Sequence, residues 1–359
     1  MESFALVSAT DNRERIIKRH PFLRYLPKKY AKACLKYIPA RKTGIIMDKE
    51  DHKALGYIID VPGFFMGWDE MVARERMKNI IGIEKTLRAL NVRILSFPLA
   101  YRYLNEREMT YLSSKGIIIL DSHYQRLASL MLALRQLGFI MRKDLPFIEA
   151  GIWGADTDTG RAFVDLVAEK INHLCIGGSN RRELAAIADR VLSTTGLSCR
   201  ITTDPRTCLN SKNIAILAEP VDQSYNIVRP SFHIRAYMKL AGQDISIRPD
   251  TGVYVLDMGW LDFPQDLATE LSLEPIEELG VLEGLLYNIS RVYREDILKG
   301  RLTSDLLNRI GAIYGLYPLK IKGFISETDR IHFDSVRMDY FRFRKKRVND
   351  KCTRGNNIP

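Results

Sequence analysis

The sequence is short of the residues that build disulfide frameworks and metal sites. Its five cysteines are scattered over 359 residues, none of them in a Cys-x-x-Cys pair, and its six histidines lie apart from one another and from the cysteines. An odd number of cysteines without framework spacing is typical of reduced thiols in a cytoplasmic protein. We therefore expect a cytoplasmic protein with neither a disulfide scaffold nor a metal site.

Long hydrophobic runs are also missing. No apolar stretch approaches the ~20 residues that a membrane-spanning helix needs. The first residues, Met-Glu-Ser-Phe-Ala, do not place a basic segment before an apolar one, so the pattern predicts no signal peptide. Apolar residues nevertheless make up 46% of the chain, which is enough for packed cores, and the length favours two domains.

Acidic residues are outnumbered by basic ones. The chain carries 54 Lys and Arg against 43 Asp and Glu, a net charge of +11, and the excess gathers in residues 13–42 and 341–347. Three anionic partners fit this balance, namely nucleic acid, a membrane surface and an acidic carrier protein, and the alternative is simply solvated faces and an unstructured tail. No nucleic-acid-binding module is recognisable, which makes nucleic acid the least favoured partner.

Strand-like and helix-like segments alternate along most of the chain. Short β-branched runs predict strands over residues 56–61, 92–96, 117–120, 148–153, 174–176, 199–202, 213–217 and 253–256. Apolar residues at helical spacing predict helices over 66–90, 106–114, 126–138, 159–171, 182–194, 279–297 and 304–314, and two short helices broken by prolines within 11–42. Such alternation is typical of parallel sheets with right-handed crossovers.

These elements predict an α/β fold with two domains. We expect an N-terminal α/β domain on the substrate side at residues 1–140 and a Rossmann-type parallel-sheet domain at 141–265. C-terminal helices within 266–336 are expected to pack back on the first domain, and a basic tail covers 337–359.

A candidate phosphate-binding loop follows the strand predicted at 148–153. Dinucleotide-binding loops use glycines for a tight turn, for close approach to the pyrophosphate and for packing of the helix on the strand. Here Thr157 replaces the middle glycine, and two carboxylates flank it. The amides that open the helix still favour an anion, although the fold would also persist if cofactor binding were lost. The candidate cofactor-binding residues are Gly154, Ala155, Asp156, Thr157, Asp158, Thr159 and Gly160.

The end of the following strand favours NADP over NAD. An NAD site places a carboxylate there to hold the ribose 2′-hydroxyl, whereas this strand runs into Gly-Gly-Ser-Asn-Arg-Arg with no acidic residue before Glu183. Two arginines suit a 2′-phosphate, and the alternative is that they merely begin a solvated helix. The candidate residues are Ser179, Asn180, Arg181 and Arg182.

A second candidate site follows the buried strand predicted at 117–120. Ligands of α/β proteins lie at the carboxyl ends of parallel strands, so Ser122, His123 and Tyr124 are predicted to line a substrate cleft between the domains. Cys208 is predicted to belong to the core rather than to act as a nucleophile. No complete catalytic motif is present in the sequence.

Several motifs in a consistent order carry a family resemblance. They are Gly56–Asp60, Leu120–Tyr124, Trp153–Gly160, Ser179–Asn180, Tyr254–Gly259 and the Pro-Phe-Leu-Arg-Tyr-Leu-Pro run at 21–27. Together they resemble the fatty-aldehyde-forming long-chain acyl-acyl-carrier-protein reductases and their bacterial relatives. The resemblance implies NADPH-dependent reduction of an acyl thioester to an aldehyde through a cysteine acyl-enzyme, with an acidic acyl carrier protein as partner.

The sequence departs from that family at two functional positions. One is Thr157, and the other is Gly284, which falls where the family has its cysteine. Two hypotheses follow. The chain is either a divergent NADP-dependent reductase acting on an activated acyl group, or a catalytically inactive Rossmann-fold protein (a pseudoenzyme) that binds nucleotide or a protein partner.

Overall fold

The computed structural model divides into two compact units. Unit 1 comprises residues 1–125 and 263–300, and unit 2 comprises residues 126–262 and 301–359. The residues that the structure describes are 3–8, 17, 24–27, 30, 35, 38–62, 68, 71–98, 100–140, 147–210, 212–221, 232–235, 254–264, 266–270, 272–316, 319–326 and 329–338. The proline-broken helices predicted within 11–42, most of the basic segment 13–42 and the tail from 339 lie outside them.

Unit 1 is built on a six-stranded sheet, called sheet A. Its strand order is β13-β2-β3-β1-β4-β5. Neighbouring strands from β3 to β5 are parallel, whereas β2 and β13 add an antiparallel edge. The strands are β1 (Phe4–Ser8), β2 (Arg41–Asp48), β3 (Ala54–Asp60), β4 (Ile94–Ser96), β5 (Ile118–Leu120) and β13 (Leu267–Thr269).

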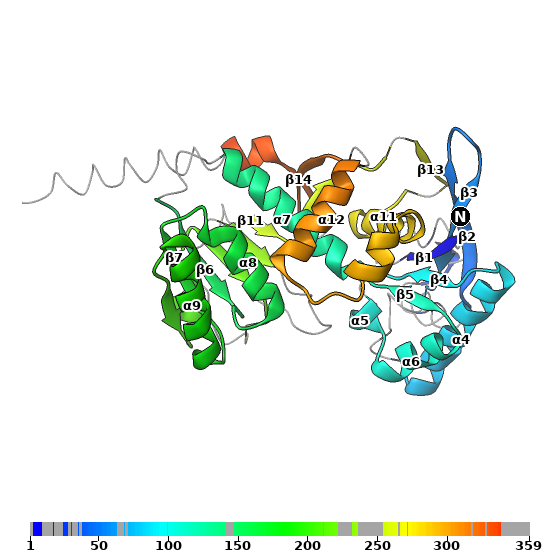
Figure 1. Cartoon of the computed structure of the whole chain (residues 1–359). Helices are drawn as coiled ribbons and strands as arrows, with labels where there is room; N and C mark the ends of the chain where they lie inside the picture. Colours follow the sequence, from blue (N-terminus) through cyan, green and yellow to red (C-terminus); the bar gives the residue numbers. More distant parts are fainter. Residues whose placement is uncertain are drawn as a thin grey trace, which may run out of the picture. The chain divides into compact units, whose positions relative to one another are not determined.

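Helices cover both faces of sheet A, so its central strand is apolar throughout. All five residues of β1 are buried. Because successive side chains of a strand point to opposite faces, Ala5 and Val7 join the core with helices α4 (Ala73–Ala89) and α6 (Glu106–Ser114). Phe4 and Leu6 join the other core, which includes Val281 of α11 (Pro275–Ile289). Figure 1 shows α11 lying over these strands.

The helix α11 approaches β1 closely at two glycines. A Cβ at Gly280 would lie 2.7 Å from Leu6 Cδ1, and one at Gly284 would lie 2.4 to 2.7 Å from three ring atoms of Phe4. Phe4 and Leu6 are fully buried, so neither can move aside without disturbing the core. Residue 284 is therefore a packing position.

Unit 2 is built on a second six-stranded sheet, called sheet B. Its order is β11-β10-β9-β6-β7-β8, and all five pairings are parallel. The strands are β6 (Glu149–Trp153), β7 (His173–Gly177), β8 (Arg200–Thr202), β9 (Ile214–Leu217), β10 (Phe232–Arg235) and β11 (Tyr254–Leu256). Numbered within the sheet and taken from β8, this is the order 3-2-1-4-5-6 of a dinucleotide-binding Rossmann domain. The predicted α/β fold with a Rossmann-type parallel sheet is confirmed.

Two helices follow the first strands of sheet B and one short helix lies against β6 and β7. Those following the strands are α8 (Asp158–Ala168) and α9 (Arg181–Thr195). The short helix α10 (Pro205–Leu209) brings the carbonyl of Cys208 to within 2.1 Å of where a Cβ of Gly151 would be. Cys208 lies in this helix, which begins with Pro205 at the first helical position and Asp204 as its cap. Its side chain is fully buried in the core.

The remaining elements of unit 2 extend it beyond sheet B. Helix α7 (His123–Ile140) begins in unit 1 and continues in unit 2, where α12 (Ser304–Leu316) contacts α8. A three-stranded antiparallel sheet consists of β12 (Met258–Leu261), β14 (Ile321–Ser326) and β15 (Asp329–His332). Of the C-terminal helices predicted within 266–336, α11 belongs to unit 1 and α12 belongs to unit 2.

Two predicted helices have other bounds in the structure. The one predicted over 279–297 begins at Pro275, where the amide of Glu274 donates to Glu277, and ends at Ile289 because Ser290 is extended. A short π-helical segment, Tyr293–Ile297, follows it. The helix predicted over 66–90 begins at Ala73. A four-residue helix, α5 (Ala100–Tyr103), was not predicted.

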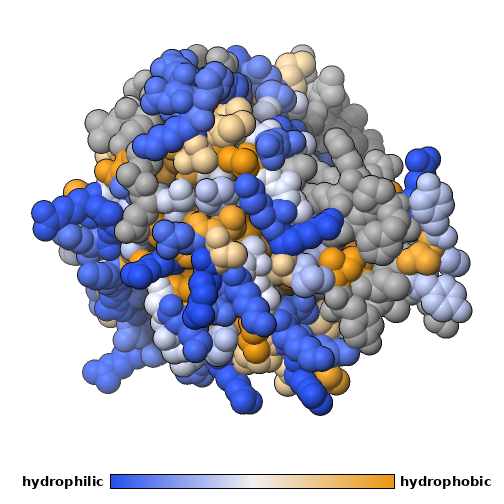
Figure 2. Space-filling view, turned by 90° about the vertical axis from the view of Figure 1, so that its right-hand side faces the viewer, coloured by the Kyte–Doolittle hydropathy of each residue, from blue (hydrophilic) through white to orange (hydrophobic). Residues whose placement is uncertain are grey.

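The described helices include none that is long and apolar enough to cross a bilayer. The face in Figure 2 is largely hydrophilic, with hydrophobic residues in small separate groups.

The contact between Gly284 and Phe4 predicts a specific loss of stability. Gly284→Ala should lower the free energy of unfolding by about 1 to 3 kcal/mol, because the added methyl group overpacks the core. Gly82→Ala is the matched control in the same unit, since its Cβ would meet only Ala40, at 3.6 Å, and a helix gains roughly 0.5 to 1 kcal/mol from alanine. Urea unfolding of both variants measures the difference; equal stability would contradict the packing role.

Candidate functional site

The phosphate loop turns sharply at Gly154, directly after β6. Gly154 has a φ of +78°, and a Cβ there would lie 2.9 Å from the backbone nitrogen of Glu219. A Cβ at Gly160 would lie 2.0 Å from the carbonyl oxygen of Gly154. The first glycine thus makes the turn and the last lets the first turn of α8 pack on it, which are the roles that glycine has in such loops.

Thr157 occupies the middle position without backbone strain. Its φ is −85° and its ψ 161°, and it is the N-cap of α8. Its hydroxyl oxygen accepts from the amide of Gly160 at 3.0 Å and donates to the carbonyl of Gly154 at 2.7 Å. The amides of the next two residues, Asp158 and Thr159, donate to no acceptor in the described part of the chain. They are the donors that a helix N-terminus offers to an anion.

Asp156 ties this loop to the loop after β7. Its Oδ2 accepts from the amide of Asn180 at 2.8 Å and from the hydroxyl of Ser179 at 3.2 Å. Its Oδ1 is buried without a hydrogen-bond partner among the described residues. A Cβ at Gly178 would lie 2.1 Å from that oxygen. The carboxylate therefore fills the space between the two loops.

A second acidic group, Glu219, lies against Gly154, two residues beyond the end of β9. Burial and, after it, the charge of Asp156 raise the pKa of Glu219 above its usual value. Sequence reasoning missed this residue. The rule that ligands lie at carboxyl ends of parallel strands would have drawn attention to it.

Arginines offset part of the acidity of the loop. Arg301 makes two bonds to Asp158, at 2.7 and 3.0 Å, and these hold the pKa of Asp158 below its usual value. Arg161 donates to the carbonyl of Asp156 and to the carboxylate of Glu183, both at 3.0 Å. Arg301 is 143 residues from its partner in the sequence, so no local pattern could have indicated this pair.

The two predicted phosphate-binding arginines stand at the start of α9. Asn180 caps this helix by accepting from the amides of Arg182 and Glu183. The side chains of Arg181 and Arg182 are exposed and have no ion pair within the described residues. The structure thus brings Asp156, Ser179 and Asn180 together and leaves both guanidinium groups accessible.

The second candidate site, in unit 1, contains a fully buried carboxyl group. Ser122 is a non-glycine residue with a φ of +59°. Its amide and hydroxyl donate to Glu283 of α11, at 2.7 and 3.0 Å, and the hydroxyl of Tyr293 donates to the same carboxyl at 2.8 Å. Strained backbone of this kind is common at functional sites.

The other two residues predicted here also have partners within unit 1. The amide of His123 donates to Asp121 at 3.0 Å, and the hydroxyl of Tyr124 donates to the carbonyl of Gly300 at 3.2 Å. The three residues therefore lie just after the carboxyl end of β5, and Ser122 contacts the middle of α11. Their assignment to a substrate cleft stays a prediction.

Burial controls the ionisation of Glu283. It raises the pKa of Glu283 to about 8, and the neighbouring carboxyl of Asp121 adds to the shift. Burial likewise raises the pKa of Asp121. Glu283 therefore carries a proton at neutral pH, and one of its hydroxyl partners accepts a hydrogen bond from it.

No thiol in the described part of the chain is both accessible and readily ionised. Cys175 and Cys208 are buried in unit 2, and burial raises the pKa of Cys199 to about 11. Gly284 has no space for a cysteine side chain beside Phe4. Cys34 and Cys352 lie outside the described residues.

The protonated Glu283 predicts a characteristic pH dependence of stability. The unfolded chain releases this proton above pH 4.5, whereas the folded chain keeps it up to about pH 8, so the contribution is lost as pH rises through that window. Each pKa unit corresponds to about 1.4 kcal/mol. Glu283→Gln should therefore weaken the fall of the melting temperature between pH 5 and 9.

The exposed Glu295 of the same unit provides the control for this measurement. Glu295→Gln should leave the slope of melting temperature against pH unchanged. A Glu283→Gln variant with the wild-type slope would show that Glu283 ionises normally in the folded state.

Comparisons with known proteins give only distant likenesses. No family model matches the chain, and no curated protein matches it. L-tryptophan dehydrogenase from Nostoc punctiforme aligns over 97% of this chain and 89% of its own, with 12% identity and a TM-score of 0.38. Shikimate 5-dehydrogenase from Listeria monocytogenes aligns over 86% and 96%, with 10% identity and a TM-score of 0.30.

A third solved structure matches a smaller part. The Δ1-pyrroline-2-carboxylate reductase of Thermococcus litoralis aligns over 29% of this chain, with 18% identity and a TM-score of 0.23, and the match spans 36% of that enzyme. The strand order of sheet B, and not these likenesses, is what assigns the Rossmann-type fold.

Proposed function

We propose that the chain is an NADP(H)-dependent oxidoreductase. The observation that carries the proposal is the phosphate loop in its Rossmann context. The 3-2-1-4-5-6 sheet places the Gly154 turn at the carboxyl end of its first strand, and two unbonded amides open α8 there.

Two groups of residues support binding of this cofactor, and two carboxylates oppose it. The amides of Asp158 and Thr159 would hold the pyrophosphate, and the exposed guanidinium groups of Arg181 and Arg182 would hold the 2′-phosphate. A bound nicotinamide would supply the hydride for reduction of a carbonyl group. The carboxylates of Asp156 and Glu219 oppose an anion, but the raised pKa of Glu219 lowers the cost, because this group takes up a proton at a higher pH than an exposed glutamate does.

An activated acyl group, such as an acyl thioester, is the proposed substrate. The family resemblance supports it, and the basic segment 13–42 suits an acidic acyl carrier protein as partner. The described thiols do not support the acyl-enzyme that the resemblance implies. We therefore propose direct hydride transfer to the thioester carbonyl, without a cysteine intermediate. The carbon–sulfur bond then breaks, which releases the aldehyde and the carrier's thiolate, and the thiolate takes up a proton from water.

Cofactor binding should change the fluorescence of Trp153. Trp153 ends β6 directly before Gly154, is 7% exposed, and packs its indole against Gly177 at the end of β7, between the two strands whose loops would hold the cofactor. NADPH should quench this emission saturably and more tightly than NADH, and Trp153→Phe should remove most of the signal. If neither nucleotide changes the fluorescence saturably, the proposal is wrong and the catalytically inactive alternative is favoured.

Loss of the two arginines should weaken the binding of NADPH but not that of NADH. In the double variant Arg181→Ser/Arg182→Ser, NADPH affinity should fall at least about tenfold, since bonds to charged groups contribute roughly 1.5 to 3 kcal/mol. NADH affinity should stay the same. Arg88→Ser, an exposed arginine of unit 1, is the control for a general change in charge. An equal loss for both nucleotides would refute the 2′-phosphate assignment.

Direct reduction predicts resistance to thiol reagents. With NADPH and a long-chain acyl thioester, carried on coenzyme A or on an acyl carrier protein, aldehyde should form at the same rate before and after alkylation of the accessible cysteines. Complete inactivation by alkylation would instead point to the partly exposed Cys199 or to a thiol outside the described residues, Cys34 or Cys352, and serine variants of the three would distinguish them.

A further inference from the structure

A second concave surface lies in unit 2, beside the half of α8 that is remote from the phosphate loop. This α7–α8 pocket has a volume of ≈660 Å³, within the range of small-molecule sites. Residues of α7, α8, β9 and α12 line it. Asp158, where the loop enters α8, is about 12 Å along the helix axis from Leu166, which lines the pocket. None of the loop residues contributes to the lining.

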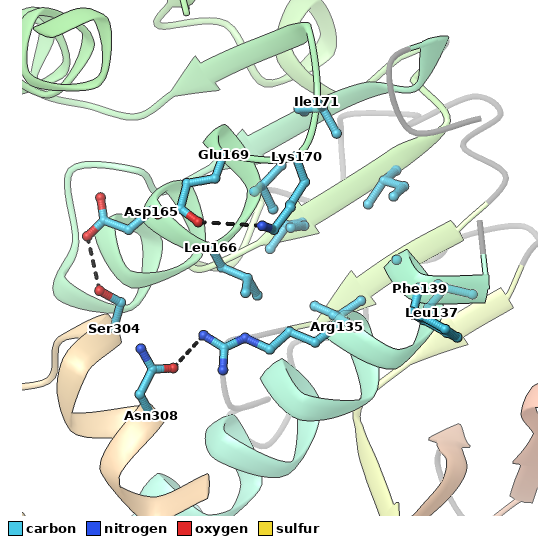
Figure 3. A pocket seen from close by; sticks show the side chains of 15 residues that line it. Arg135, Leu137, Phe139, Asp165, Leu166, Glu169, Lys170, Ile171, Ser304 and Asn308 are labelled. Atoms are coloured by element: carbon cyan, nitrogen blue, oxygen red, sulfur yellow. Dashed lines mark hydrogen bonds and ion pairs between the residues drawn. The ribbon is translucent and has the colours of Figure 1, made fainter. Parts of the chain in front are cut away.

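One end of the pocket is apolar. Leu137, Ile171 and Ile216 are buried side chains of the wall, and Leu166 adds to them from α8. Phe139 stands at the rim with 69% of its side chain exposed. Figure 3 shows Leu137 and Phe139 together at the end away from α12. A hydrocarbon group placed here would remove this apolar surface from water, which is favourable.

The other end is polar and carries one unmatched positive charge. Arg135 extends toward α12 and donates to the amide oxygen of Asn308 at 2.5 Å, as Figure 3 shows. Asp165 is already paired with Arg190 at 2.7 Å, and Glu169 lies 3.7 Å from Lys170. The four charges of the lining sum to zero, but Asp165 is paired with Arg190, which lies outside the lining. Arg135 has no carboxylate partner among the described residues, so its positive charge is available to an anionic ligand.

We propose that the α7–α8 pocket binds an amphipathic monocarboxylate. The hydrocarbon body lies against Leu137, Phe139 and Leu166, and the carboxylate accepts from the guanidinium of Arg135. The planar fork of an arginine matches the two oxygens of a carboxylate, and Asn308 fixes its position. The separation of apolar and basic groups within one cavity is what selects a ligand with a single charged end. This site does not depend on NADP(H) binding.

The test uses decanoate, below its micelle concentration, with calorimetry on the full chain. Decanoate should bind saturably with a stoichiometry of one, and 1-decanol, which lacks the charge, should bind at least about tenfold more weakly. Arg135→Gln keeps a side-chain N–H donor but removes the charge, and it should lower the affinity for decanoate by a similar factor. Arg74→Gln, an exposed arginine of unit 1, should have no effect.

A cavity-filling variant tests the position of the hydrocarbon. Leu166→Trp should abolish decanoate binding while an unchanged melting temperature reports that the protein is folded. Saturating NADPH should leave decanoate affinity unaltered, whether or not NADPH itself binds. The proposal is overturned if no saturable binding occurs, if Arg135→Gln binds like the wild type, or if NADPH displaces decanoate, which would place the carboxylate in the phosphate loop.

Discussion

Close approach of helices to parallel strands, at positions where no Cβ fits, is the constraint on which both units depend. In unit 1, α11 lies on β1 because residues 280 and 284 are glycines. In unit 2, α10 lies on β6 at Gly151, and α8 packs on the phosphate loop at Gly160. A protein core is close-packed, so a methyl group at any of these points must displace a helix or a core side chain. The glycine at position 284 is therefore explained by packing, independently of any lost chemistry.

The same approach brings two carboxyl groups to the carboxyl ends of the strands of sheet A. Because α11 packs on β1, Glu277 forms a hydrogen bond with the hydroxyl of Ser8, and Glu283 forms hydrogen bonds with Ser122 and Tyr293. Both glutamates are fully buried. Buried carboxyl groups are tolerated only when protonated or well bonded. Three hydrogen-bond partners and a raised pKa meet this condition at Glu283, so the strained turn at Ser122 and the placement of α11 stabilise each other.

Periodicity was enough to predict most of sheet B, because parallel strands buried on both faces appear as short apolar runs between amphipathic helices. It failed where the pattern was weaker. β2 begins with the polar run Arg41, Lys42 and Thr43 and was not predicted, yet it pairs antiparallel with β3 on one side and with the edge strand β13 on the other. The loop sequence predicted a phosphate site, but two residues that contact the loop are distant from it in the sequence. Glu219 and Arg301 reach the loop through the fold, which no local pattern encodes.

The acidity of the phosphate loop decides how its departure from a glycine-rich sequence should be understood. Thr157 is not the obstacle, because its backbone is extended and its hydroxyl caps α8. The obstacle is Asp156, whose carboxylate is fixed between two loops with one oxygen buried and unbonded. A pyrophosphate bound nearby would repel this carboxylate, and a proton or a cation bound together with the nucleotide would reduce the repulsion. Arg301 already neutralises Asp158, and Glu219 is predisposed to protonation. Nucleotide affinity should therefore increase as pH falls, in contrast to a glycine-rich loop without carboxylates.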